Sequence, residues 1–216
     1  MSDWIAAEWD APGRIVAGTS LRGAKNAALP LPGEPCWLNQ VHGANVVIAG
    51  QFDEPPEADA CIKGSAPFLC VVRTADCLPL LMCSMDGEVF AAAHAGWRGL
   101  AAGVIENTIA ALNVEPASLL VWLGPAISQT AFEVGAEVRD AFLTHDPMAS
   151  SCFETNARGR WQADLYGLAR QRLGAAGVLA VSGGDFCTYR DEKRFYSYRR
   201  NPDCGRLVSF IGLATP

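Results

Sequence analysis

Two of the three histidines in this chain of 216 residues stand in the same local pattern. His42 and His94 each follow an apolar run and come one or two positions before a glycine. Glycine lets the backbone turn sharply, so both imidazoles are expected at strand ends, where a rigid scaffold presents side chains to a site. His145 lies in "LTHDP", where a helix is expected to end, and is interpreted as structural.

Cys77 has the same placement, between two apolar runs and beside Asp76. Two imidazoles and one thiolate match a Zn²⁺ site with an open fourth position, which is the catalytic type of zinc site. The intervals of 35 and 17 residues between His42, Cys77 and His94 match no short metal signature. The residues alone therefore leave three alternatives open: a metal site, a Cys77 nucleophile with His94 as its base, or a purely structural role.

Three apolar runs are expected to position these groups. Residues 68–74, 78–84 and 88–96 predict consecutive strands, and the turn "SMDG" joins the last two. Cys77 and His94 are then expected to meet across this turn-linked pair of strands.

The rest of the chain mixes helical and extended patterns. Helices are predicted over 98–113, 133–144 and 164–177 (with Asp164 as N-cap), further strands over 118–124, 178–187 and 205–213, and a loop over 50–58. This mixture predicts an α/β (α+β) fold, in which residues 1–216 form a single layered domain with a mixed sheet core flanked by helices.

The composition limits the class of partner. The chain is 50% hydrophobic and 19% charged, as expected for a globular protein with a large core, and its net charge is −6. An acidic chain argues against nucleic acid polymers and anionic membranes as partners. The basic segment 189–200, followed by Arg206, is either a solvated face or a site for a small anion such as phosphate.

The eight cysteines are interpreted as reduced thiols. They form no CxxC pair, several lie inside apolar runs, and the acidic start of the chain has no apolar signal region. No apolar stretch approaches the roughly 18 residues that would predict a bilayer span. We therefore expect a cytoplasmic protein without membrane association.

Several motifs together resemble those of the laccase-domain family, whose members are called polyphenol oxidases or purine nucleoside phosphorylases. The resemblance runs from about Trp37 to the end of the chain and rests on "WLNQVHGANVV", "DACIKG", "TADCLPLL", "AAAHAGWRGLAAGVIENTI", "DLYGLAR" and "FYSYRR…GRLVSFIGL". It implies the family's own layered α/β fold and a zinc ion, or copper in some reports, bound by His42, Cys77 and His94.

The resemblance also implies an activity. Phosphorolysis of adenosine, inosine and guanosine is expected, with adenosine deamination and methylthioadenosine cleavage reported in relatives. Some bacterial members are described as amidohydrolases that edit a peptidoglycan precursor. Two departures from the family pattern concern the pocket: the part before Trp37 is short and lacks an Asn-Leu-Gly loop, and "RRNPDCGR" alters the loop before Arg206.

Roles follow for the polar residues near these motifs. Arg98 and Arg206 are predicted to bind phosphate, and Arg98, Asp76, Cys77 and His94 are the predicted catalytic residues. Asp76 is predicted either to shuttle protons during deamination or to orient a ligand imidazole.

Three further residues have either a predicted role in the pocket or a structural role. Gln40 is predicted to contact the base or ribose, or else to cap a strand end. Tyr196 and Tyr198 are predicted to stack on a purine, or else to belong to the core.

Three histidines are too few for a trinuclear copper centre, so a multicopper mechanism is excluded. A single copper ion in a His₂Cys site remains chemically permissible and keeps a polyphenol oxidase as an alternative. Three hypotheses are carried forward: a zinc-dependent phosphorylase or deaminase, a hydrolase with a Cys77 nucleophile, and a non-enzymatic metal- or nucleotide-binding regulator.

Overall fold

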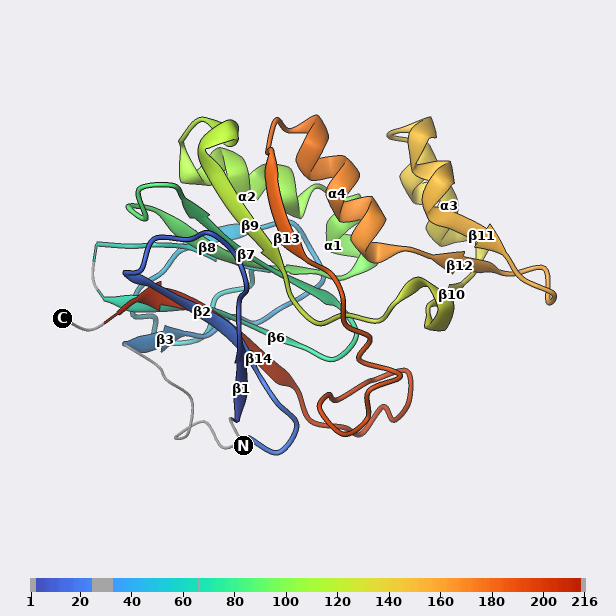
Figure 1. Cartoon of the computed structure of the whole chain (residues 1–216), viewed down its shortest axis with the longest axis horizontal. Coiled ribbons are helices and arrows are strands. Elements are labelled where there is room, and N and C mark those ends of the chain that lie inside the picture. Colours follow the sequence, from blue (N-terminus) through green and yellow to red (C-terminus); the bar gives the residue numbers. More distant parts are fainter. Residues whose placement is uncertain (1–2, 25–32, 66, 215–216) are drawn as a thin grey trace.

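Two stacked β-sheets lie at the centre of the molecule (Figure 1), which a computed structural model describes for residues 3–24, 33–65 and 67–214. The first sheet has the order β1 (Trp4–Ala6), β2 (Ile15–Ser20), β14 (Leu207–Leu213), β6 (Phe68–Thr74) and β3 (Glu34–Cys36). The second has the order β13 (Ala180–Gly183), β9 (Leu119–Leu123), β7 (Leu78–Ser84), β8 (Phe90–Ala95), β5 (Ala60–Ile62) and β4 (Val46–Ile48).

Both sheets are mixed. The pairs β3–β6, β4–β5 and β13–β9 are parallel, and the other neighbours are antiparallel. Buried side chains from the facing sides of the two sheets, such as Val72, Leu81 and Trp122, pack into one apolar cluster. The mixed-sheet α/β fold predicted from the sequence is confirmed.

Helices cover the outer face of the second sheet. Helices α1 (Trp97–Ala101), α2 (Val104–Leu112) and α4 (Leu165–Ala175) lie over it in Figure 1. Strand β8 places three alanines, Ala91, Ala93 and Ala95, in the cluster that these helices share. Because both faces of β7 and β8 are covered, every residue of these two strands is buried, which gives the site a rigid base.

A smaller unit projects to one side of the sheets. It consists of a three-stranded sheet in the order β10 (Glu133–Val134), β12 (Trp161–Ala163) and β11 (Phe153–Thr155), together with helix α3 (Ala136–Leu143) (Figure 1). Short 3₁₀ helices occupy Pro116–Ser118, Gln129–Ala131 and Pro147–Cys152. Residues 184–206, here called the C-terminal loop, contain neither helix nor strand.

The predicted strands 68–74 and 78–84 coincide with β6 and β7, and β8 lies within 88–96. The strands predicted over 118–124, 178–187 and 205–213 contain β9, β13 and β14, although β13 is much shorter than predicted, and 50–58 is a loop as expected.

Two helix predictions need correction. The segment 98–113 forms two helices, because Gly103 adopts a left-handed φ of 94° that interrupts the turn between α1 and α2. Helix α2 ends at Leu112, one residue before the predicted end at 113. The helix predicted over 133–144 begins only at Ala136, since Glu133 and Val134 pair with strand β12.

Helix α4 lies within the predicted segment 164–177. Asp164 holds its N-cap position, although its side chain makes no capping hydrogen bond. The segment before Trp37, which is short and lacks an Asn-Leu-Gly loop, includes residues 25–32, and these lie outside the described part of the chain. Among the described residues, no helix combines the length and apolar character needed to cross a bilayer.

Candidate metal centre and pocket

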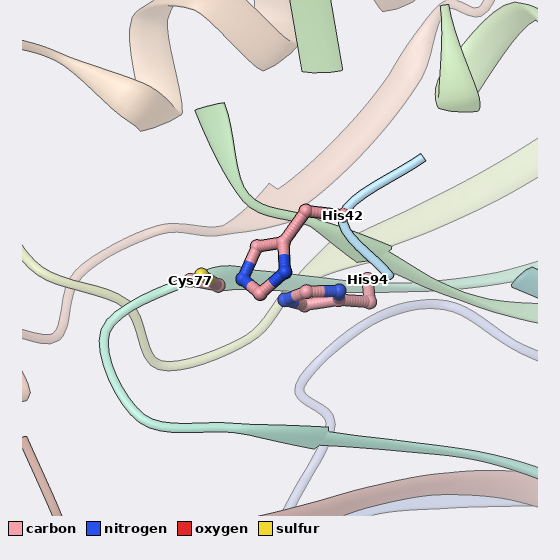
Figure 2. A group of neighbouring side chains, drawn as sticks. All are labelled: His42, Cys77 and His94. Atoms are coloured by element: carbon pink, nitrogen blue, oxygen red, sulfur yellow. The ribbon is translucent and has the colours of Figure 1, made fainter. Parts of the chain in front are cut away.

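Three side chains from separate elements converge at one end of β7 and β8. His94 belongs to β8, Cys77 comes directly before β7, and His42 lies between β3 and β4. One ligand atom of each lies within 4.8 Å of those of the other two, and Figure 2 shows the two imidazoles and the thiol facing one another. The structure therefore brings all three predicted ligands together.

Strand pairing explains this convergence. In the antiparallel β7–β8 ladder, Pro79 lies opposite His94, so that Cys77 and His94 emerge near the same end. His42 reaches them with a left-handed φ of 60°, and its ring meets that of His94 edge to face with centroids 4.8 Å apart. A left-handed residue other than glycine is uncommon and needs support from its surroundings.

That support comes from Asp59, which the sequence analysis did not identify as a site residue. Asp59 is fully buried and comes directly before β5. Its Oδ1 lies 2.7 Å from His94 Nδ1 and accepts a hydrogen bond of 2.9 Å from the His42 backbone N–H. Its Oδ2 accepts hydrogen bonds from the backbone N–H groups of Gly43 (2.6 Å) and Val41 (3.2 Å). One carboxylate thus fixes the turn that carries one imidazole and the orientation of the other.

The pKa values of Cys77, His94 and Asp59 are shifted by their mutual contacts. Burial raises the pKa of the Cys77 thiol, but hydrogen bonds with the imidazoles of His42 and His94 lower it to about 6. Burial alone would lower the pKa of His94, whereas Asp59 and the Cys77 sulfur raise it to about 9. The pKa of Asp59 is also held below its ordinary value: burial opposes this shift, and the hydrogen bond with His94 and the N–H of Gly43 produce it. Both shifts favour the thiolate form of Cys77 and the charged form of the His94 imidazole.

Gly96 leaves the space in which the three groups meet. A Cβ atom at this position would lie 3.0 Å from Cys77 Sγ, 3.1 Å from His42 Cδ2 and 3.6 Å from His94 Nε2. The first two distances are shorter than ordinary van der Waals contacts, so a side chain at position 96 would push the ligands apart.

The donor set fits a metal ion. Two imidazole nitrogens and a thiolate suit Zn²⁺ and copper, and a carboxylate bound to one ring nitrogen of a ligand histidine is the usual outer partner of such sites. Asp59 occupies Nδ1 of His94 and so leaves Nε2 as its ligand atom.

A cavity of about 760 Å³ opens over these residues. Its lining includes the three candidate ligands, the apolar side chains of Ile127, Phe132 and Leu165, and four arginines: Arg73, Arg98, Arg199 and Arg206. Both predicted phosphate-binding arginines are thus in the pocket, and the structure adds Arg73 and Arg199.

The guanidinium groups of the four pocket arginines contact aromatic rings and no carboxylates among the described residues. Within the described residues, none of them forms an ion pair with a carboxylate. Each guanidinium instead lies over an aromatic ring, with Cζ-to-centroid distances of 4.4 Å (Arg98–Trp97), 5.5 Å (Arg199–Phe132), 5.7 Å (Arg206–Tyr198) and 5.8 Å (Arg73–Trp37). The pocket of this acidic protein is therefore locally cationic, which favours an anionic ligand.

Asp76 also lines the cavity, but its carboxylate is directed toward the C-terminal loop. It accepts hydrogen bonds from the hydroxyls of Thr188 (2.6 Å) and Ser197 (3.0 Å) and from the backbone N–H of Arg199 (2.7 Å). The carboxylate in contact with a ligand imidazole is that of Asp59 instead.

Gln40 lines the pocket, yet both ends of its amide bind the backbone of Arg73. Nε2 donates to the carbonyl at 2.9 Å, and Oε1 accepts from the N–H at 2.8 Å. The Gln40 amide is thus engaged by the backbone of β6, and its contact with base or ribose stays a prediction.

Tyr196 and Tyr198 lie in different surroundings. Tyr198 lines the cavity and is 53% exposed, whereas Tyr196 accepts a hydrogen bond from Gly23 N–H and lies outside the lining. His145 is an exposed residue just beyond α3, away from the pocket, at the helix end that the sequence predicts.

Comparisons with known proteins agree with this architecture. Residues 15–214 match the family described as multi-copper polyphenol oxidoreductase laccase. A purine nucleoside phosphorylase of Pseudomonas aeruginosa is 45% identical over an alignment of 241 positions, gaps included, which covers 99% of each chain. The purine nucleoside phosphorylase YfiH of Escherichia coli is 49% identical over 188 residues, covering 87% of this chain and 77% of the relative. The crystal structure of a Neisseria meningitidis protein superposes with a TM-score of 0.92 at 39% identity, over 99% of this chain and 100% of that one.

Proposed function

The chain belongs to the multi-copper polyphenol oxidoreductase laccase family, and on this premise we propose that it is a zinc-dependent purine nucleoside phosphorylase. Its proposed substrates are adenosine, inosine, guanosine and methylthioadenosine, each with inorganic phosphate. Relatives named purine nucleoside phosphorylase support the reaction class. The observation that carries the proposal is the pocket itself, in which four arginines without carboxylate partners among the described residues line the same cavity as a His₂Cys donor set.

Phosphorolysis joins a phosphate oxygen to C1′ of the ribose and breaks the bond from C1′ to the purine nitrogen, which leaves with a proton from phosphate or water. Arg98 and Arg206 are proposed to hold the phosphate, because a guanidinium fork binds two oxyanion oxygens at once. The exposed ring of Tyr198 is proposed to stack on the purine.

His42, Cys77 and His94 are proposed to hold the zinc ion, with Asp59 fixing the orientation of two of them. When bound, zinc supplies a positive charge that polarises a substrate oxygen or holds phosphate. Adenosine deamination is proposed as a second reaction of the same pocket, with water replacing the amino group at C6. Asp76 is the predicted proton shuttle for that reaction, although the three donors on its carboxylate favour a different role.

The test is an assay of inosine with and without phosphate, paired with elemental analysis of the purified protein. We expect hypoxanthine and ribose 1-phosphate only when phosphate is present, and one zinc ion per chain. Cys77→Ala and His94→Ala should each abolish turnover and zinc content, while His145→Ala, an exposed histidine outside the pocket, should change neither. Release of hypoxanthine that needs no phosphate, or turnover that survives complete removal of metal, would contradict the proposal.

A second candidate function is supported by the polarisation of Cys77. The Cys77 thiol has a pKa lowered to about 6 and lies within 4.8 Å of the ligand atom of His94, which in turn contacts Asp59, so the three have the order of nucleophile, base and orienting group. This arrangement suits an amidohydrolase that acts on a peptidoglycan precursor. Hydrolysis of an amide by fully metal-free protein, abolished by stoichiometric alkylation of Cys77, would favour this candidate over the first.

Copper is the alternative metal, and a single-copper polyphenol oxidase is the corresponding alternative activity. Intense visible absorption of copper-loaded protein with phenol oxidation would support it.

We further propose that residues 1–216 act as a single domain and that the protein works in the cytoplasm. The eight free thiols support this location, because a reducing compartment keeps cysteines reduced.

A further inference from the structure

Asp76 has an unusual backbone conformation for its residue type. Its φ of 89° lies in the left-handed region, which only glycine adopts freely. A residue other than glycine keeps such a conformation only where its surroundings determine it through several contacts. The contacts of Asp76 therefore indicate what the conformation achieves.

All three donors to the Asp76 carboxylate come from the C-terminal loop. Thr188 Oγ1 donates to Oδ1, while Ser197 Oγ and the backbone N–H of Arg199 donate to Oδ2. The hydroxyl-bearing residues Thr188 and Ser197 are fully buried, and Asp76 itself is only 8% exposed. Both carboxylate oxygens are thus committed to the loop, away from solvent.

The loop depends on such contacts because it has no helix or strand of its own. The guanidinium of Arg200 binds the carbonyls of Thr188, Tyr189 and Phe195, and these bonds hold the loop together internally. They do not connect it to the metal centre. The contact with Asp76 does, and it lies next to Tyr198 and Arg199, two of the three loop residues (with Arg206) that line the same pocket as the candidate ligands.

The backbone of Asp76 completes the connection. Its carbonyl accepts a hydrogen bond of 3.0 Å from Ile127 N–H, which belongs to a further wall of the pocket, and the next residue is the candidate ligand Cys77. We propose that Asp76 is a positioning residue, which holds residues 188–199 against the Cys77 turn and thereby sets Tyr198 and Arg199 for substrate binding. Only its kinetic consequence rests on the proposed phosphorylase function.

This role and that of a proton shuttle predict different kinetics. A shuttle acts in the chemical step, so its removal lowers kcat and alters the pH profile while KM stays nearly constant. A positioning residue of the substrate wall acts on binding, so its removal raises KM for inosine and phosphate with a smaller effect on kcat. Loss of the loop donors should then reproduce the effect of losing the carboxylate.

The experiment compares Asp76→Asn, Ser197→Ala and Thr188→Val with the control Asp203→Asn, which alters an exposed carboxylate of the same loop. Each variant is measured for kcat and KM with inosine and phosphate, for metal content, and for amide hydrogen exchange of residues 188–199. We expect KM to rise about tenfold or more in the three test variants, as for loss of a hydrogen bond to a charged group, with kcat within about threefold of wild type. Exchange of 188–199 should accelerate in all three, while strands β7 and β8 and the control stay unchanged.

The proposal is overturned if Asp76→Asn lowers kcat by more than about a hundredfold at constant KM while Ser197→Ala and Thr188→Val are silent. It is also overturned if exchange of residues 188–199 in the three variants equals that in Asp203→Asn. Should Asp76→Asn fail to fold, the two hydroxyl variants decide in the same way. If wild-type protein shows no phosphorolysis, the proposed function fails, and the exchange measurement alone decides on the role of Asp76.

Discussion

Replacing Asp59 by asparagine tests how the metal centre is assembled. The carboxylate accepts from four donors, two at each oxygen, and it is fully buried. Asparagine has nearly the same shape but offers only one acceptor oxygen, and its NH₂ group must face one of the two donor pairs. Either orientation of the amide therefore leaves two groups without their acceptor.

The two orientations have different consequences. If the NH₂ group faces Val41 and Gly43, two buried N–H groups lose their acceptor, which costs about 1–3 kcal/mol each. If it faces His42 and His94, the imidazole must accept at Nδ1 and carry its proton on Nε2, the atom that is left to bind metal. We expect Asp59→Asn to lower the free energy of unfolding by about 2–6 kcal/mol and to weaken zinc binding about 10- to 100-fold.

The assay is urea unfolding of metal-free protein at several pH values, combined with zinc competition against a chromophoric chelator. The pKa of Asp59 is lowered in the folded protein. Its contribution to stability is therefore present above the unfolded value of about 4 and is lost as pH falls through the lower folded value. Asp59→Asn should remove this acid-dependent loss, while Asp53→Asn, an exposed carboxylate of the loop 50–58, should leave stability and zinc affinity unchanged. Wild-type zinc affinity in a folded Asp59→Asn variant would refute the reasoning.

Three further predictions concern the same pocket. In metal-free protein, the rate at which iodoacetamide alkylates Cys77 should increase with pH through a midpoint of about 6, because the thiolate is the nucleophile; Cys77→Ala identifies this reaction by abolishing it. A midpoint above 8 would contradict a lowered pKa of Cys77. Gly96→Ala should release zinc, since the new Cβ would lie 3.0 Å from Cys77 Sγ, whereas Gly174→Ala, with open space around its Cβ, should retain full zinc content by elemental analysis. Arg98→Met should raise KM for phosphate about tenfold or more in the inosine assay, whereas the exposed Arg160→Met should not; equal values for both variants would remove Arg98 from the phosphate site.

The strands that support the site could be predicted because their signals are local. Apolar runs with polar breaks gave the bounds of β6 and β7 correctly, and the break between them gave Cys77. The helix predicted over 133–144 failed at its start because Glu133 and Val134 pair with a strand almost 30 residues later in the chain, where the local helical pattern carries no trace of that partner. Gly103 offered a local signal for the break between α1 and α2, since an isolated glycine within a helical pattern is unfavourable.

Asp59 was not identified as a site residue for a related reason, although it opens the motif "DACIKG". It contacts His94 across 35 residues, and its role follows from full burial, which composition does not reveal. The available signal was a charged residue directly before the apolar run "ACI", a position where a buried carboxylate needs partners. The partners of Asp76 lie still farther away in the sequence, at Thr188 and Ser197. Its position beside Cys77 therefore suggested a chemical role, whereas in the fold its carboxylate binds the C-terminal loop.

The two strained residues of the site show what these carboxylates accomplish. Among the described residues, three other than glycine have positive φ, and two of them, His42 and Asp76, are a candidate ligand and the neighbour of one. Each such conformation costs of order 1–3 kcal/mol and persists only where other contacts offset it. Asp59 holds the turn of His42 through three backbone N–H groups, and the carboxylate of Asp76 holds its own residue through three donors of the C-terminal loop. Two buried carboxylates that are not themselves among the candidate ligands thus stabilise the strained backbone on either side of the site, at the ligand His42 and at the neighbour of the ligand Cys77.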